Sequence, residues 1–280
     1  MSAFRYVVAD VFTDKPLAGN QLAVFTDARE IPEDLLQPLA REMNFSETVF
    51  VLPKESDGHA RIRIFTPTIE IPFAGHPTLG TAFVLAAPLQ LGEIRLETGA
   101  GVVPVRLERE GPRIVFGRME QPIPTVEPYE NEAELLDALG VARSELPVEV
   151  YDNGLRHVYI ALPSEDDVAA LKPDLARLAE PPAVLGINTF AGSGSRWKTR
   201  MFAPGDGVPE DPATGSAAGP LGAYLSARGV AGMPGGTLVA QGEQVGRPSF
   251  LHLEVTPEDD SFAVRVGGGV RVVGEGAFRL

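Results

Sequence analysis

Two stretches of the chain decide the fold, because they repeat one pattern about half a chain apart. The first reads RIFTPTIEIPFAGHPTLGTAFVL over residues 63–85, and the second reads RMFAPGDGVPEDPATGSAAGPLG over residues 200–222. Four pairs coincide at an offset of 137, namely Arg63/Arg200, Phe65/Phe202, Pro67/Pro204 and Pro72/Pro209. In each copy a strand-like run leads through a turn into a helix of small apolar residues. The pattern predicts an internal duplication.

A duplication implies two similar halves. We expect the first half to span 1–117 and the second 118–269, with the last strand, 270–280, able to join the first half. The Pro-rich segment 121–128 is a stiff connector near the boundary. Residues 45–48 also lie about 141 before residues 186–189, where the pattern recurs more loosely. The alternative is chance, because four identities can arise in a chain with 25 prolines.

Strand-like runs outnumber helical ones. Several of them, such as Arg61–Phe65, alternate apolar and polar residues as half-buried strands do. Helices are predicted at Glu33–Met43, Asn131–Leu139, Asp166–Leu171, Pro77–Ala86 and Thr214–Ala227. The last two are apolar all round, which is typical of buried helices. We predict an α+β fold of two pseudo-symmetric halves, each a β-barrel-like sheet around a central helix.

Composition excludes several classes of protein. The 280 residues carry a net charge of −14 and have no clustered Lys or Arg, which argues against binding nucleic acid or an anionic membrane surface. Cysteine is absent, so disulfides, thiolate zinc sites and thiol catalysis are excluded. The first twenty residues do not resemble a targeting segment, and no apolar run reaches the length of a membrane span. We expect a soluble cytoplasmic protein.

Two helix starts, one per half, are candidate anion sites. Residues 74–78 and 211–216 each place glycine at the start of a helix, where free backbone N–H groups and the helix dipole favour a carboxylate. Taken singly, each is better interpreted as an ordinary helix start. If the duplication is real, the two starts serve one substrate.

Glu47 and His76 are the side chains best suited to proton transfer. Glu47 lies between apolar residues after a helix, so it is either a surface residue of a strand or a buried one, and burial would raise its pKa toward neutrality. His76 follows a glycine at a helix start. His157 and His252 lie in strand patterns and are interpreted as packing or surface residues, and His59 as exposed. Three further carboxylates, Glu70, Asp206 and Glu210, are interpreted as solvated charges or turn formers.

Neither a metal nor a nucleotide cofactor is expected. No two histidines have the spacing of metal ligands, and cysteine is lacking. The Gly-rich runs at 192–194 and 267–269 match neither a dinucleotide fingerprint nor a P-loop. We therefore expect no metal site and no cofactor.

Five ordered motifs resemble the PhzF family of phenazine-biosynthesis isomerases. They lie at residues 18–25, 44–50, 72–80, 211–217 and 241–249 and so span nearly the whole chain. The resemblance implies the diaminopimelate-epimerase-like fold, with the active site between two similar halves, and a homodimer. Related epimerases and racemases use two thiols at the helix starts, but this chain has no cysteine. Two-thiol chemistry is therefore excluded on a shared scaffold.

The resemblance also implies roles for individual residues. Glu47 matches the catalytic acid/base, His76 the active-site histidine and Asp211 the active-site aspartate. The substrate-binding positions are Asn20, Ser46, Gly75, Gly215 and Ser216. The implied activity is a cofactor-independent proton shift on a small conjugated carboxylic acid of the trans-2,3-dihydro-3-hydroxyanthranilate type. The alternatives are an epimerase or isomerase of another small amino or hydroxy acid, and a non-catalytic protein that binds a small acid.

Overall fold

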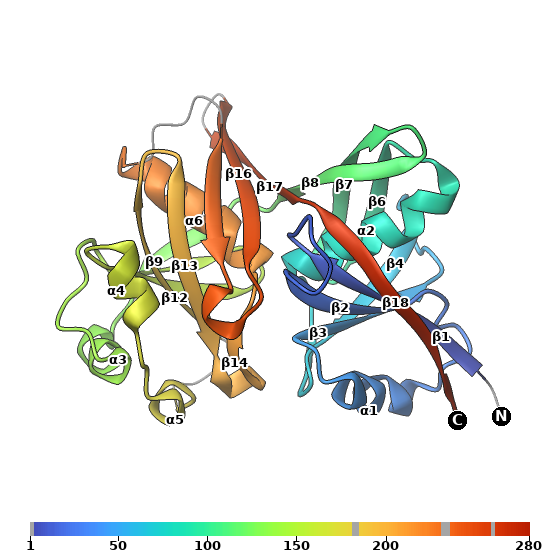
Figure 1. Ribbon diagram of the computed structural model, residues 1–280, viewed down its shortest axis with the longest axis horizontal. Helices are drawn as coiled ribbons and strands as arrows, with labels where there is room; N and C mark the ends of the chain where they lie inside the picture. The colour runs from blue at the N-terminus through green and yellow to red at the C-terminus, as the bar shows by residue number, and fades with distance from the viewer. Residues whose placement is uncertain (1–2, 181–184, 231–235, 259–260) are drawn as a thin grey trace. The chain divides into compact units, whose positions relative to one another are not determined.

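The chain forms two compact units. The computed structural model describes residues 3–180, 185–230, 236–258 and 261–280. Unit 1 consists of residues 1–120 together with 267–280, and unit 2 of residues 121–266. Strands are more numerous than helices in each unit, and one long buried helix lies among them in each (Figure 1). The predicted α+β class, with a central helix in each half, is confirmed.

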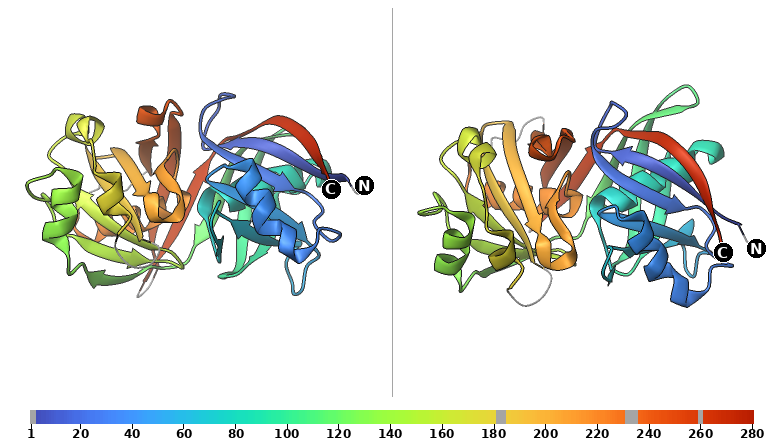
Figure 2. Two further views of the ribbon diagram at one scale, coloured as in Figure 1. Left: turned by 90° about the horizontal axis from the view of Figure 1, so that it is seen from below. Right: turned by 60° about the horizontal axis from the view of Figure 1, so that its bottom comes forward.

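Unit 1 begins and ends with paired strands. Its elements are β1 (Ala3–Val11), β2 (Asn20–Phe25), α1 (Glu33–Met43), β3 (Glu47–Leu52), β4 (Ala60–Phe65), β5 (Glu70–Ile71), α2 (Gly75–Leu89), β6 (Glu93–Thr98), β7 (Gly101–Glu110), β8 (Arg113–Gln121) and β18 (Val270–Arg279). β1 pairs antiparallel with both β2 and β18, so the last strand of the chain lies beside the first (Figures 1 and 2). The amphipathic α1 packs its apolar face on β3 and β4.

Unit 2 is continuous in sequence. Its elements are β9 (Thr125–Pro128), α3 (Glu132–Leu139), β10 (Glu149–Asp152), β11 (Arg156–Ala161), α4 (Glu165–Ala170), α5 (Leu175–Leu178), β12 (Leu185–Ser193), β13 (Arg196–Ala203), β14 (Val208–Asp211), α6 (Gly215–Ala227), β15 (Thr237–Gln241), β16 (Ser249–Glu258) and β17 (Ser261–Gly268). Short 3-10 turns lie at Pro204–Asp206 and Glu243–Val245. Buried apolar residues of α3, α4, β10, β11 and β12 pack together and form a hydrophobic core of this unit.

Glycines allow the central helices to approach the strands closely. A Cβ on Gly80 of α2 would lie 2.5 Å from the side chain of Leu22 on β2. On α6, a Cβ on Gly219 would lie 2.1 Å from Oε1 of Gln121, and one on Gly222 would lie 2.9 Å from Val255. Cores packed at crystal-like density leave no space for these atoms. The small residues that marked both helices in the sequence are therefore packing requirements.

Gly219→Ala should destabilise unit 2 by about 1–3 kcal/mol, although alanine is the better helix former. The added methyl group would collide with the buried amide of Gln121, which donates a hydrogen bond to the carbonyl of Gly215. Urea unfolding measures the effect. The control is Gly92→Ala, because nothing lies within 4 Å of a Cβ at that position. Equal stability of the two variants would contradict this packing argument.

The two units share one order of elements. In each, a parallel pair of strands (β2/β3 and β11/β12) is followed by an antiparallel strand (β4 and β13), a short strand (β5 and β14) and the buried helix. The strand after the helix then pairs parallel with β4 or β13, and an antiparallel strand follows it. The repeated pattern in the sequence therefore corresponds to repeated topology.

The strand registers correct two of the matches made from the sequence. Thr48 pairs with Phe65 and Ile187 pairs with Phe202, so Glu47 corresponds to Gly186, and the offset of about 141 is wrong by two residues. The connection from β13 to β14 is three residues longer than the connection from β4 to β5. Ile71 therefore corresponds to Asp211, and the match of Pro72 with Pro209 is wrong.

Candidate functional site

Three predicted site residues of unit 1 come together at the start of α2. Glu47 is the first residue of β3, and its Oε2 lies 3.3 Å from Nε2 of His76, the second residue of α2. Nδ1 of the same imidazole lies 3.2 Å from Nδ2 of Asn20, at the start of β2. His76 and Asn20 are buried, and the Glu47 side chain keeps 14% exposure. The parallel pairing of β2 and β3 thus holds a carboxylate and an amide on the two sides of one imidazole.

Burial keeps the imidazole of His76 neutral. It lowers the pKa of His76 to about 3, although a hydrogen bond with the Gln21 backbone acts in the opposite direction. An imidazole with that pKa is a weaker base than an ordinary carboxylate, whose pKa is about 4. Within the pair, His76 is therefore a neutral neighbour of the Glu47 carboxylate.

The first turn of α2 presents backbone N–H groups without a side-chain cap. The residue before the helix is Ala74, which has no side-chain acceptor, and Gly75 opens the first turn. Such a start favours an anion. Ser46, predicted to bind substrate, is half-buried in the bend just before β3.

Asp211 of unit 2 is hydrogen-bonded within its own turn. Its Oδ2 accepts a hydrogen bond of 2.6 Å from the hydroxyl of Thr214. Gln241 holds the same turn: its Nε2 donates to the Asp211 carbonyl at 2.8 Å, and its Oε1 accepts from the Thr214 N–H at 3.1 Å. The sequence motif at 241–249 contained Gln241, but no role followed for it from spacing.

Ser216, the second residue of α6, contacts a histidine that the sequence did not single out. Its Oγ lies 3.2 Å from Nε2 of His157. His157 is buried, so its interpretation as a packing residue misses a polar contact to a predicted site residue. The strand β11 and the helix α6 bring these two residues together, and no short motif in the sequence marks the pair.

Side-chain amides support the first turn of α6. Pro220 has no N–H, so the carbonyl of Ser216 lacks its usual helical donor. Nδ2 of Asn153 donates to that carbonyl at 3.0 Å, and Nε2 of Gln121 donates to the Gly215 carbonyl at 2.7 Å. The helix start that carries Gly215 and Ser216 is therefore held rigidly.

Among the other carboxylates, the interpretation of Glu210 is wrong. It forms a bidentate ion pair with Arg200 at 2.9 and 2.7 Å, in which the two side chains are only 12% and 8% exposed. Asp206 is half-buried, and burial raises its pKa. Glu70 agrees with its interpretation as a solvated charge, because it pairs with Arg63 at the surface and its side chain is 40% exposed.

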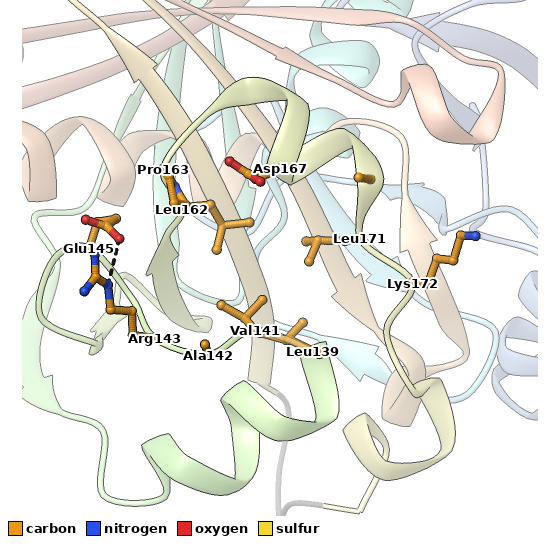
Figure 3. Close-up of a pocket in the computed structure, with 12 residues that line it drawn as sticks. Leu139, Val141, Ala142, Arg143, Glu145, Leu162, Pro163, Asp167, Leu171 and Lys172 are labelled. Carbon is orange, nitrogen blue, oxygen red and sulfur yellow. Dashed lines mark hydrogen bonds and ion pairs between the residues drawn. The ribbon is translucent and has the colours of Figure 1, made fainter.

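A further pocket of unit 2 contains none of the predicted site residues. It encloses about 570 Å³ between the loop after α3 and the helix α4 (Figure 3). Leu139, Val141, Leu162 and Leu171 form its apolar lining, and Arg143 and Glu145 pair at 3.1 Å on its rim.

Within residues 3–180, 185–230, 236–258 and 261–280, no three His, Asp or Glu side chains gather as they would around a metal ion. In the same part of the chain, no helix is long and apolar enough to cross a membrane.

Acid should destabilise the protein before most carboxylates titrate. Burial lowers the pKa of both His76 and His157 to about 3, whereas in the unfolded chain both titrate near 6.5. The unfolded state therefore binds more protons below pH 6.5, and the unfolding free energy falls there by about 2 kcal/mol per histidine at pH 5. Urea unfolding at pH 7.5 and pH 5 measures this. His157→Gln should remove about half of the difference, and a pH-independent stability in that window would contradict the burial of both imidazoles.

A family model described as phenazine biosynthesis-like protein matches residues 9–276. The chain belongs to the phenazine biosynthesis-like protein family. The family's model thus covers both units and every predicted site residue. The resemblance inferred from five short motifs is confirmed over almost the full length.

Relatives that match over nearly their full length are named isomerases. The chain is 46% identical to the trans-2,3-dihydro-3-hydroxyanthranilate isomerase of Pseudomonas aeruginosa, over 97% of this chain and 98% of that protein. It is 45% identical to the isomerase of the same name from Pseudomonas fluorescens, over 99% of both. An uncharacterised isomerase of Escherichia coli O157:H7 is 35% identical over 90% of each chain. This member of the family is accordingly an isomerase.

Solved structures agree with the fold. A phenazine biosynthesis protein of the PhzF family from Bacillus anthracis superposes with a TM-score of 0.87 at 25% identity, over all of both chains. A hydroxyproline epimerase from Agrobacterium vitis superposes with a TM-score of 0.68 at 13% identity, over 99% of this chain and 91% of that one. The second likeness shows that the fold is shared with an epimerase.

Proposed function

We propose that this family member isomerises trans-2,3-dihydro-3-hydroxyanthranilate, or a closely similar conjugated carboxylic acid, by moving one proton. The observation that carries the proposal is the 3.3 Å contact of the Glu47 carboxylate with the buried, neutral imidazole of His76. The identity of 44–46% to three isomerases of that substrate supports the choice of acid.

The proposed reaction needs only an acid/base and a bound carboxylate. Glu47 takes a proton from a ring carbon, and the negative charge spreads through the conjugated system toward the substrate carboxylate. The same carboxyl group then returns the proton to another ring carbon on the same face. One C–H bond breaks and one forms, so the step is balanced without an oxidant, a reductant or a cofactor. A positioned acid/base of this kind contributes about 10²–10⁴-fold.

The remaining site residues are proposed to bind and polarise the substrate. His76, held by Asn20, is neutral and suited to a hydrogen bond with a developing negative charge. The uncapped start of α2 at Gly75 offers N–H groups to a carboxylate, and Ser46 is proposed to bind the substrate as well. Asp211, Gly215 and Ser216 complete the proposed set, which rests on their match to the family's motifs.

Turnover in D₂O tests the proposal. The purified enzyme is given trans-2,3-dihydro-3-hydroxyanthranilate, and NMR follows loss of the substrate and the hydrogen at each ring carbon. The expected result is a shifted double-bond system with a hydrogen relocated on the ring. A parallel sample with trans-4-hydroxy-L-proline tests the alternative of another small acid. Epimerisation of that acid without turnover of the dihydroanthranilate would overturn the proposal.

EDTA should leave the rate unchanged. The sequence has no cysteine and no spaced pair of histidines, and the proposed step uses only side chains and backbone N–H groups. Initial rates before and after dialysis against EDTA check this. A rate that falls and recovers on addition of Mg²⁺, Mn²⁺ or Zn²⁺ would show that a metal takes part.

Two further properties are proposed from the family resemblance. We propose a homodimer, which light scattering would detect as twice the 29.8-kDa mass of the chain. We also propose a cytoplasmic location, which cell fractionation would test.

A further inference from the structure

The imidazole of His157 packs against Gly186, where the lack of a side chain leaves room for the ring. His157 lies on β11 opposite Gly186 of the parallel strand β12. A Cβ on Gly186 would lie 2.3 Å from Nδ1 of the imidazole, so no other residue fits there without moving the ring. By strand register Gly186 corresponds to Glu47 of unit 1, where the carboxylate meets the helix start. In unit 2 the imidazole of His157 meets the helix start instead.

Asn188 sets the tautomer of this imidazole. Its Nδ2 donates to the carbonyl of Gly186 at 2.9 Å, which orients the amide with its nitrogen toward His157. That nitrogen lies 3.4 Å from Nδ1 of His157. Two N–H donors cannot face each other, so Nδ1 is unprotonated and the ring proton is on Nε2. Burial keeps the ring neutral by lowering its pKa to about 3.

The tautomer determines the direction of the hydrogen bond to Ser216. With its proton on Nε2, His157 donates to Oγ of Ser216 across 3.2 Å. The serine hydroxyl then accepts from the imidazole, and its own proton is turned to a different acceptor. Ser216 is the second residue of α6, where backbone N–H groups already favour an anion.

We infer that His157 is a positioning residue that holds the Ser216 hydroxyl as a hydrogen-bond donor to the substrate carboxylate. The inference rests on the proposed function, because it takes the bound group to be the carboxylate of the substrate. Asn188 and Gly186 serve the same arrangement, one by orienting the imidazole and the other by giving it room. His157 itself does not touch the substrate.

The test measures binding of 3-hydroxyanthranilate, which has the carboxylate, amine and hydroxyl of the proposed substrate on an aromatic ring. Calorimetry gives its Kd for the wild type, Ser216→Ala, His157→Phe, and the double variant. We expect Kd to rise about tenfold in each single variant, the size of one hydrogen bond to a charged group. The double variant should bind no more weakly than Ser216→Ala alone, because the imidazole acts only through the hydroxyl.

The variant His157→Gln distinguishes a positioning role of His157 from a role in packing alone. The amide N–H of His157→Gln can take the place of the Nε2–H, so this variant should restore Kd to within about threefold of the wild type. With the turnover substrate, His157→Phe should raise KM about tenfold and leave kcat nearly unchanged, as expected for binding that is equal in the ground and transition states. Urea unfolding identifies any variant that fails to fold. If His157→Phe fails to fold, the Kd of His157→Gln is compared with that of the wild type.

The outcomes distinguish this inference from the proposed function. A wild-type enzyme that turns over the dihydroanthranilate, with Kd unchanged in His157→Phe, overturns the inference alone. Additive effects in the double variant also overturn it. A wild type that binds 3-hydroxyanthranilate in a His157-dependent manner but does not isomerise the dihydroanthranilate supports the inference and overturns the proposed function.

Discussion

Glu47→Gln should lower kcat for trans-2,3-dihydro-3-hydroxyanthranilate by at least about 100-fold, the usual contribution of a positioned acid/base. Glutamine keeps the shape of the side chain and removes the carboxylate beside His76. Neither His76 nor Asn20 can replace it, because burial holds the pKa of His76 at about 3, and Asn20 does not titrate.

Binding and stability should change little in the same variant. The Kd of 3-hydroxyanthranilate should stay within about twofold, because backbone N–H groups at the helix starts, rather than Glu47, are proposed to hold the carboxylate. The unfolding free energy should be unchanged or higher, because an amide costs less to bury than a carboxylate. Calorimetry and urea unfolding give these two measurements, and stopped-flow absorbance gives kcat.

The matched control for Glu47→Gln is Glu70→Gln. Glu70 is a surface residue whose partner Arg63 keeps a second carboxylate, Glu33, so the control should lose neither activity nor stability. Full turnover by Glu47→Gln would remove the basis of the proposed mechanism. A variant that unfolds would show that Glu47 is needed for the fold and would also contradict the expectation.

Arg200→Met should cost about 3–5 kcal/mol of unfolding free energy. The change leaves the carboxylate of Glu210 almost buried without its partner, and an uncompensated buried charge carries a cost of this size. It also removes a guanidinium that donates to the Leu171 carbonyl at 2.8 Å, just beyond α4, and lies 5.0 Å from the centre of the Phe202 ring. Urea unfolding, with the midpoint and slope fitted separately, measures the loss.

The repeat supplies the control for this variant. Arg63 corresponds to Arg200, but its partners Glu33 and Glu70 are 76% and 40% exposed. Arg63→Met should therefore cost no more than about 1 kcal/mol. Adding Glu210→Leu to Arg200→Met should recover most of the lost stability, since an apolar pair is a tolerable replacement for a buried ion pair. Equal losses in the two single arginine variants would show that burial does not set the cost.

Helices that are apolar all round were the most predictable feature of the fold. The expected helix at 214–227 is observed at Gly215–Ala227, and that at 77–86 extends to Gly75–Leu89. Both could be predicted because a surface helix shows a polar face and these do not. The strand β12 is hard to predict, because its sequence, LGINTFAGS, contains glycine, asparagine and alanine, which are depleted in strands. It is stabilised by pairing with β11 on one side and β13 on the other, and tertiary pairing of that kind outweighs propensity.

The candidate site was predictable only where a motif lies within one short segment. Glu47 and His76 could be selected singly, yet their 3.3 Å contact depends on β3 and α2 meeting in space. His157 depends on Gly186 and Asn188, which lie about thirty residues away on a neighbouring strand. The burial of Glu210 likewise depends on Arg200 of the adjacent strand β13. Spacing along the chain does not report such contacts, because strand pairing brings these residues together.

The pairing of β18 with β1 imposes an order on biosynthesis. Unit 2 is one uninterrupted segment, so all of its strands have been translated while residues 270–279 are still to come. β1, by contrast, has one open edge until β18 pairs with it. Domains fold as units during synthesis, and the unit translated first here is the last to be completed. A chain that ends at residue 268 would contain every strand of unit 2, while unit 1 would lack β18 and its first strand would keep an edge able to pair with another chain.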